Sequence, residues 1–179
     1  EHQRDGTLAL ADIEAAIKPD DAHFARSRLL ALENTFGGKV LPFDYVQQAT
    51  RLAKDRGLNT HLDGARLFNA AVAQADAMAG AQDPYVQARR IAGCFDSVSV
   101  CFSKGLGTPM GSALCGSREL IARAHRVRKM AGGGMRQAGF VAASAIHALD
   151  HHVLRLADDH RLARRLADGL AGIEGLSVE

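Results

Sequence analysis

Two charged residues that follow strand-like apolar runs are the features of this chain that most clearly suggest chemistry. Asp63 follows the segment Leu58 to Leu62, and Lys104 follows the segment Ser97 to Phe102. Both runs are typical of buried strands, and open α/β sheets bind their ligands beyond the strand ends. A carboxylate and an amine that are buried near each other cost free energy unless a ligand uses them. We therefore expect both side chains in one site.

Pyridoxal phosphate is a cofactor that uses one acidic side chain and one amine. Its aldehyde requires a lysine for the Schiff base, and its pyridinium nitrogen requires an acidic partner. A desolvated Lys104 amine is a usable nucleophile, and a negative charge on Asp63 keeps the ring nitrogen protonated. The ordinary alternatives are a surface lysine at a turn and an aspartate that caps the helix after it. The pair is more specific than either residue alone.

Other polar residues near these two positions suggest anion binding. Arg66 lies one helical turn after Asp63, and its guanidinium can hold a carboxylate through two hydrogen bonds. Ser103 can donate to a phosphate. Gly132 to Gly134 precedes a helix start and, with Arg136, can bind an anion through backbone N–H groups and charge. The corresponding alternatives are a solvent-facing arginine, a strand-end serine and a flexible hinge.

Three histidines late in the chain do not indicate a metal site. The spacing of His151, His152 and His160 matches no standard set of ligands, and histidines on a helix surface explain it better. We therefore predict no metal. The sequence also contains no Walker or dinucleotide fingerprint, and it offers no local support for Ser/His/Asp or Cys/His catalysis.

The composition is that of an ordinary globular protein. The chain has 179 residues, 47% hydrophobic and 23% charged, which is enough for one domain with a sizeable core or for parts of two. A net charge of +2 is too small to favour nucleic acid or a membrane as a partner, and we expect neither. The three cysteines form no CxxC pair, and Cys101 and Cys115 lie in apolar contexts. Reduced core thiols and a cytoplasmic location are therefore expected.

The elements that must position the charged residues alternate between strands and helices, which predicts a mostly parallel sheet. Strands are expected at 28–33, 58–62, 97–102 and 111–115, and helices at 8–18, 43–56, 66–79, 84–91 and 118–130. A long helix is expected from Met135 to Leu170, with at least one bend. Its predicted apolar face comprises Phe140, Ala143, Ile146, Leu149, Val153 and Leu156.

Several motifs resemble those of the low-specificity L-threonine aldolases, which are fold-type I pyridoxal-phosphate enzymes of the β-eliminating lyase/threonine aldolase superfamily. The resemblance runs over nearly the whole chain. The matching stretches are Leu32-Glu33-Asn34-Thr35, the run from His61-Leu62-Asp63-Gly64-Ala65-Arg66 to Ala70, Phe95-Asp96-Ser97-Val98-Ser99, Ser103-Lys104-Gly105-Leu106-Gly107, and the run from Arg128 through Gly132-Gly133-Gly134-Met135-Arg136 to Gly139.

The resemblance implies a fold and a domain organisation. It implies an α/β protein with the large domain of the PLP-dependent transferases, of which aspartate aminotransferase is the type, built on a mostly parallel sheet. Both ends of the chain look truncated. We expect residues 1–155 to be part of the cofactor-binding large domain and residues 156–179 to begin the small C-terminal domain.

The resemblance also implies residue roles. Lys104 and Asp63 are the implied catalytic residues, which bind the cofactor through its Schiff base and its pyridine nitrogen. Arg66 is implied near the substrate carboxylate or the cofactor's phenolic oxygen. Ser103 is implied at the phosphate, and Arg136 near the cofactor, reaching across a dimer interface.

The implied reaction is retro-aldol cleavage of a β-hydroxy-α-amino acid. L-Threonine or L-allo-threonine would yield glycine and acetaldehyde, which places the enzyme among the lyases of amino acid metabolism. A homo-oligomer, either a dimer or a tetramer, is implied as well. Two alternatives stay open. One is another fold-type I lyase or a racemase that shares Lys104 and Asp63, and the other is a catalytically incomplete fragment that only packs or dimerises.

Overall fold

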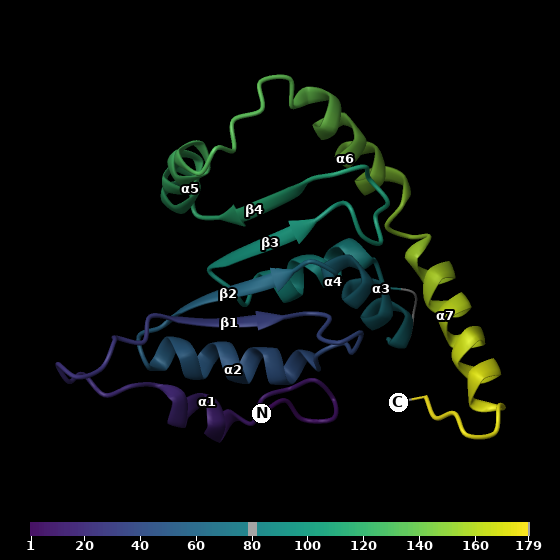
Figure 1. Ribbon diagram of the computed structural model, residues 1–179, viewed down its shortest axis with the longest axis horizontal. Helices are drawn as coiled ribbons and strands as arrows, with labels where there is room; N and C mark the ends of the chain where they lie inside the picture. Colours follow the sequence, from purple (N-terminus) through teal and green to yellow (C-terminus); the bar gives the residue numbers. More distant parts are fainter. Residues whose placement is uncertain (79–81, 179) are drawn as a thin grey trace.

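A four-stranded sheet forms the centre of the molecule in the computed structural model, which describes residues 1–78 and 82–178 (Figure 1). The strand order is β1-β2-β3-β4. Strand β2 pairs in parallel with β1 and with β3, whereas β4 is antiparallel to β3. The predicted mostly parallel sheet is therefore confirmed. The strands are β1 (Leu29–Glu33), β2 (Asn59–Gly64), β3 (Ser97–Cys101) and β4 (Ser112–Gly116).

The helices begin and end at recognisable signals. In α4, Pro84 occupies the first turn and the Asp83 carboxylate accepts a hydrogen bond from the N–H of Tyr85. Ser117 caps α5 through the N–H of Leu120. The helices are α1 (Leu10–Ala16), α2 (Phe43–Asp55), α3 (Leu67–Ala77), α4 (Pro84–Ala92), α5 (Arg118–Met130), α6 (Gly139–His151) and α7 (Leu156–Ala171). The last residue of the helix expected at 66–79 lies outside the described residues.

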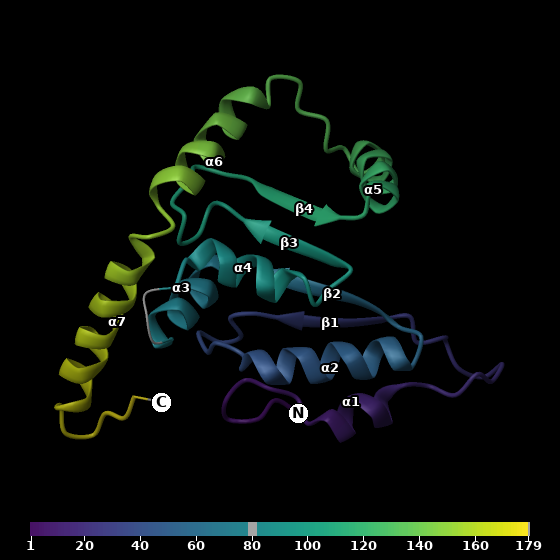
Figure 2. The ribbon, with the colours of Figure 1, turned by 180° about the vertical axis from the view of Figure 1, so that it is seen from behind.

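The two faces of the sheet have different surroundings. Alternate strand residues, including Leu30, Leu62 and Val98, are buried in one cluster with apolar side chains of α2, α3 and α4. Figure 2 shows α4 in front of the strands and α2 alongside β1. The intervening residues, such as His61 and Asp63, are half-buried or exposed on the other face. We call these the covered face and the open face.

A second, smaller cluster lies beyond the carboxyl end of β3. Its fully buried or nearly buried members are Val72, Leu106, Ala148, Val153 and Leu156. They come from α3, from the turn after β3, from α6, from the connection between α6 and α7, and from the start of α7. Helix α7 also packs against α3, at the edge of the sheet where β1, β2 and β3 end (Figure 1). This cluster fixes the turn that carries Lys104 to the surrounding helices.

Two expectations about packing are wrong at least in part. The helix expected from Met135 with at least one bend is two helices, α6 and α7. Only the end of its predicted apolar face is buried: Val153 and Leu156 are fully buried, whereas Phe140 is 78% exposed and Ile146 is 60% exposed. In α6, Ala145 and Ala148 are buried instead. Cys115 is exposed and not a core residue, because β4 is the last strand at this edge of the sheet.

In the described part of the chain, no helix is both long and apolar enough to cross a membrane.

Candidate active site at the carboxyl edge of the sheet

Asp63 occupies the next-to-last position of β2, on the open face of the sheet. It lies opposite Glu33 of β1 and Ser99 of β3 in the register of the sheet. One carboxylate oxygen, Oδ1, accepts a hydrogen bond from the N–H of Ala65 at 3.0 Å. Gly64 permits this turn, because a Cβ at that position would lie only 2.8 Å from the carbonyl oxygen of Ser99. The backbone therefore holds Asp63 at the strand end with its second oxygen unused by these contacts.

Lys104 lies three residues past the end of β3, in a tight turn. The N–H of Gly107 donates to the Lys104 carbonyl at 2.9 Å, and the N–H of Thr108 donates to the Phe102 carbonyl at 3.1 Å. Leu106 is 3% exposed and anchors the turn in the second cluster. The Lys104 side chain is exposed and makes no ion pair or side-chain hydrogen bond with the described residues. The turn is thus rigid at its base and leaves the amine accessible.

The turns that follow β2 and β3 touch each other. A narrow cavity of about 10 Å³ is lined by Gly64 and Arg66 at the end of β2, by Asn69 in the first turn of α3, and by Gly105 and Leu106 in the turn after β3. The strands themselves are hydrogen-bonded neighbours that run in parallel. The structure therefore brings the segments that carry Asp63 and Lys104 to one edge of the sheet.

The expectation that Asp63 and Lys104 are buried is wrong for this chain. Both side chains are exposed. Asp63 is on the face that the helices leave open, and Lys104 projects from a turn beyond the strand. Within the described residues, nothing therefore desolvates either charge, and the chemistry that the site can perform depends on what binds over the open face.

Of the remaining predicted site residues, Arg66 and Ser103 lie near Asp63 and Lys104, whereas Arg136 does not. Arg66 is the N-cap residue of α3, one turn from Asp63, and is exposed. Ser103 adjoins Lys104, and its hydroxyl lies 3.4 Å from the Cys101 sulfur. Arg136 lies in the connection between α5 and α6, which runs beyond β4 at the top of Figure 1. This chain alone therefore does not bring Arg136 to the edge where Asp63 and Arg66 lie.

Two buried polar groups at the end of β1 lack hydrogen-bond partners among the described residues. They are Asn34 Nδ2 and Thr35 Oγ1, in residues that are 0% and 4% exposed. Asn34 is joined to the site, because its N–H donates to the carbonyl oxygen of Asp63 at 3.1 Å. Buried polar groups are normally paired, so these unpaired atoms fit an edge that takes part in binding.

Sequence reasoning missed three histidines near the site. His61 shares the open face with Asp63 and is 2.8 Å from the Ser97 hydroxyl; strand alternation alone indicates this position. His152 and His160 are half-buried and hydrogen-bonded, so the expectation of surface histidines holds only for His151. No local signal identifies His152 and His160, because their partners lie far away in sequence. The described residues contain no cluster of three or more ligands suited to a metal.

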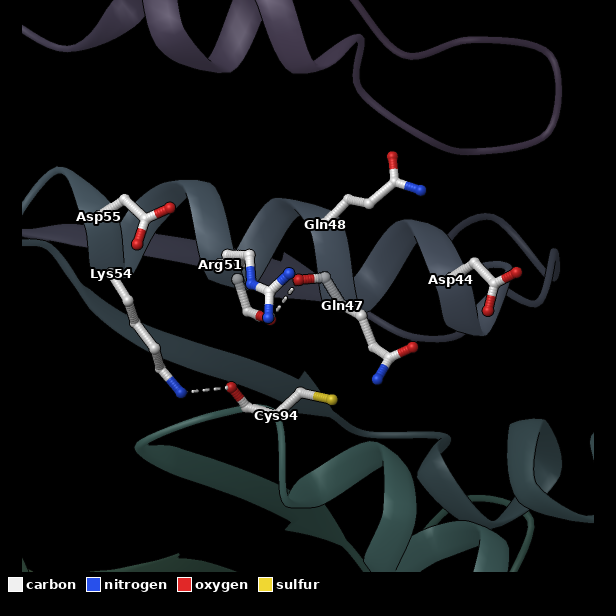
Figure 3. A pocket seen from close by; sticks show the side chains of 8 residues that line it. Asp44, Gln47, Gln48, Arg51, Lys54, Asp55 and Cys94 are labelled. Atoms are coloured by element: carbon white, nitrogen blue, oxygen red, sulfur yellow. Dashed lines mark hydrogen bonds between the residues drawn. The ribbon is translucent and has the colours of Figure 1, made fainter.

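A separate hollow of about 580 Å³ lies along α2 (Figure 3). Lys54 crosses it and donates to the Cys94 carbonyl at 3.0 Å. Burial raises the pKa of the Cys94 thiol, although Lys54 and Arg90 partly oppose this. Asp44 and Arg51 also line the hollow, on the outer side of the helical layer. It shares no residue with the edge that carries Asp63 and Lys104.

Comparison with known proteins identifies the family. The model of the beta-eliminating lyase family matches residues 1–179, and the chain belongs to this family. The low-specificity L-threonine aldolase of Escherichia coli is 49% identical over 166 residues, covering 93% of this chain and 47% of that protein. The low-specificity L-threonine aldolase 1 of Arabidopsis thaliana is 42% identical over 182 residues, covering 99% and 48%. The chain thus spans about half the length of the curated relatives it matches.

Solved structures agree with the architecture. A threonine aldolase of Leishmania major superposes with a TM-score of 0.78 at 24% identity, covering 94% of this chain and 48% of that one. An aromatic-amino-acid aminotransferase of Burkholderia pseudomallei superposes with a TM-score of 0.57 at 19% identity. These likenesses confirm the predicted fold class, an aminotransferase-like α/β fold.

Proposed function

We propose that this chain carries the lysine and the aspartate of a pyridoxal-phosphate-dependent threonine aldolase. The observation that carries the proposal is the placement of Asp63 and Lys104 at the ends of adjacent parallel strands, in turns that share a cavity. The substrates would be L-threonine and L-allo-threonine, and the products glycine and acetaldehyde. Membership of the beta-eliminating lyase family and two relatives named as L-threonine aldolases support this assignment.

The residues present fit the cofactor. Lys104 offers an accessible primary amine for covalent attachment, and Asp63 has one carboxylate oxygen that accepts from the backbone and one left for a ring nitrogen. Unpaired polar atoms of Asn34 and Thr35 lie at the same edge. When bound, pyridoxal phosphate supplies a ring that accepts electrons from the bond to be broken. Ser103 and Arg136 are proposed to contact the cofactor.

Each side chain has a defined task in the proposed reaction. The amine of Lys104 would hold the cofactor at the end of β3. With the cofactor bound, the Asp63 carboxylate would keep the pyridine nitrogen protonated, which would matter most when negative charge develops during Cα–Cβ cleavage. Arg66 is proposed to bind the substrate carboxylate, because a guanidinium matches a carboxylate through two parallel hydrogen bonds.

Assembly and location are also proposals. We infer a homo-oligomer, a dimer or a tetramer, in which Arg136 reaches the site of another copy. Exposed apolar side chains on α5 and α6, such as Val127 and Phe140, are compatible with such contacts. A cytoplasmic location is supported by the free thiols of Cys94, Cys101 and Cys115.

The function is tested by product analysis on the full-length protein loaded with pyridoxal phosphate. We expect L-threonine and L-allo-threonine to yield acetaldehyde and glycine in equal amounts. The family description favours one competitor, a β-eliminating lyase, which would release pyruvate from L-serine. Pyruvate or the D-amino acid as the main product, without aldehyde, would overturn the aldolase assignment. The same assay on residues 1–179 alone tests whether this chain is catalytically incomplete.

A further inference from the structure

The turn that carries Lys104 is held by a histidine that is distant in sequence. Nδ1 of His152, the C-cap residue of α6, lies 2.7 Å from the carbonyl oxygen of Leu106. A carbonyl oxygen only accepts, so Nδ1 of His152 carries the proton and donates it. Leu106 is two residues after Lys104 and is itself nearly buried. This hydrogen bond therefore ties the backbone next to Lys104 to the end of α6.

A second contact holds the same turn from another side. The amide of Asn69, in α3, packs against the backbone of Gly105, where a Cβ would lie 2.9 Å from Asn69 Oδ1 and 3.0 Å from Leu156 Cδ2. Nδ2 of the same amide lies 3.2 Å from Nε2 of His160 in α7. The amide can only donate through Nδ2, so Nε2 of His160 accepts. Helices α3 and α7 together thus fix the amide against Gly105.

We propose that His152 and the Asn69–His160 pair are positioning residues for Lys104. They hold Gly105 and Leu106 from behind, while the Lys104 side chain itself stays exposed. Lysine has many rotamers, and only a fixed backbone limits the region that its amine samples. The expected effect on catalysis rests on the proposed function. The expected effect on the conformational stability of the turn does not.

Hydrogen exchange, measured on the full-length protein without cofactor, tests how readily the turn that carries Lys104 opens. The N–H groups of Gly107 and Thr108 close the turn, so their exchange reports its opening. We expect His152→Leu to speed their exchange about fivefold to tenfold, the effect of one lost hydrogen bond, and to leave α2 unchanged. His152→Asn places an amide donor near the lost Nδ1–H and should restore slow exchange. His151→Leu makes the same change at the adjacent exposed position and should have no effect.

Covalent capture tests the consequence for Lys104. Pyridoxal phosphate is added, the adduct is fixed with borohydride, and the modified lysine is quantified by peptide mass spectrometry. We expect capture at Lys104 to slow about fivefold to tenfold in His152→Leu, with recovery in His152→Asn. Asn69→Leu removes the second contact from a different helix and should act in the same direction, which keeps the proposal testable if His152→Leu does not fold.

The outcomes separate the two proposals. Absence of capture in the wild-type protein would refute the proposed cofactor chemistry, but accelerated exchange in His152→Leu would still support the anchoring of the turn. Unchanged exchange in both His152→Leu and Asn69→Leu would overturn the positioning role. The positioning role of His152 is also excluded if His152→Asn behaves like His152→Leu, because the lost donor would then not be the cause.

Discussion

The covered face and the open face of the sheet carry different kinds of side chain on the same strands. On the covered face, Leu62 is fully buried against the helices, together with Leu32 and Val98. On the open face, one residue further along the same strand, Asp63 is exposed beside a partly exposed His61. Because successive side chains of a strand point to opposite faces, neighbouring residues of β2 serve stability and chemistry separately.

This difference separates the effects of substitution. A change on the covered face removes packing that the folded state requires, whereas a change on the open face or in the turns beyond it removes groups that the core does not use. The turn after β3 combines both properties, since Leu106 belongs to the second cluster and Lys104 does not. Substitutions at adjacent positions should therefore give different phenotypes.

Replacement of Lys104 is expected to have the largest effect on activity. Lys104→Ala removes the amine that attaches the cofactor, so turnover should fall by more than about a thousandfold, with an unchanged unfolding temperature because the side chain is exposed. Visible absorption and mass spectrometry measure the attachment. Lys18→Ala, at another exposed lysine, is the control and should behave like the wild type. Attachment that persists in Lys104→Ala would contradict the assignment.

Replacement of Asp63 should slow the reaction without preventing attachment of the cofactor. Asp63→Ala removes the charge that keeps the ring nitrogen protonated, and kcat should fall about a hundredfold to a thousandfold, as when one electrostatic group is lost from an active site. Steady-state kinetics with L-threonine measure the change. Asp55→Ala removes an exposed carboxylate from the end of α2 and should leave kcat unchanged. Wild-type turnover in Asp63→Ala would refute the role of this residue.

Truncation of Leu62 should lower stability, in contrast to the two preceding substitutions, which should lower activity. Leu62→Ala leaves a cavity in a fully buried position and should lower the free energy of unfolding by about 3 kcal/mol. The matched control is Leu29→Ala on the open face, where the side chain is 54% exposed and the loss should stay below about 1 kcal/mol. Urea unfolding measures both. Equal losses would show that the open face is covered in solution.

The smallest expected effect concerns the opposite end of the sheet. Burial opposes ionisation of Asp96, but hydrogen bonds from the N–H and hydroxyl of Thr60, with Lys54 nearby, hold the pKa of Asp96 below its ordinary value. Its contribution to stability is therefore complete above the unfolded pKa of 3.8 and is lost as the pH falls through the lower folded value. Unfolding measured between pH 2 and about 6 should show this loss in the wild type and a flatter curve in Asp96→Asn. Identical curves would exclude Asp96 as a source of the acid dependence.

Local patterns predicted most of the elements. Strand and helix signals placed α2, α5 and the four strands within a few residues of their observed bounds. Apolar periodicity, the Ser117 cap of α5 and Gly57, which follows α2 with a positive φ of 71°, all act over short distances. The placement of the segments that carry Asp63 and Lys104 at one edge of the sheet also followed from the sequence, because neighbouring parallel strands end at the same edge. The division of the chain at residues 155 and 156, and the contacts of Arg136, stay predictions.

Local sequence patterns did not predict which side chains are buried in α6 and beside the open face. The apolar spacing of α6 predicted burial of Phe140 and Ile146, but both are exposed, and Ala145 and Ala148 are buried instead. A periodic pattern describes an available face, and only the partner determines whether that face or another is used. The exposure of Lys104 was missed for the same reason, because burial depends on what lies over the open face.

Residue types and their spacing were enough to predict the alternation of strands and helices, the apolar residues of the covered face, and the acidic and amine side chains at two strand ends. These properties depend on residue types a few positions apart, whose spacing is set by the backbone. The tertiary structure alone decided that the two turns touch, that Asn69 lies against Gly105, and that His152 holds Leu106 across 46 residues of chain. Such contacts arise only when separate helices pack around one turn, and no local pattern of residues encodes that arrangement.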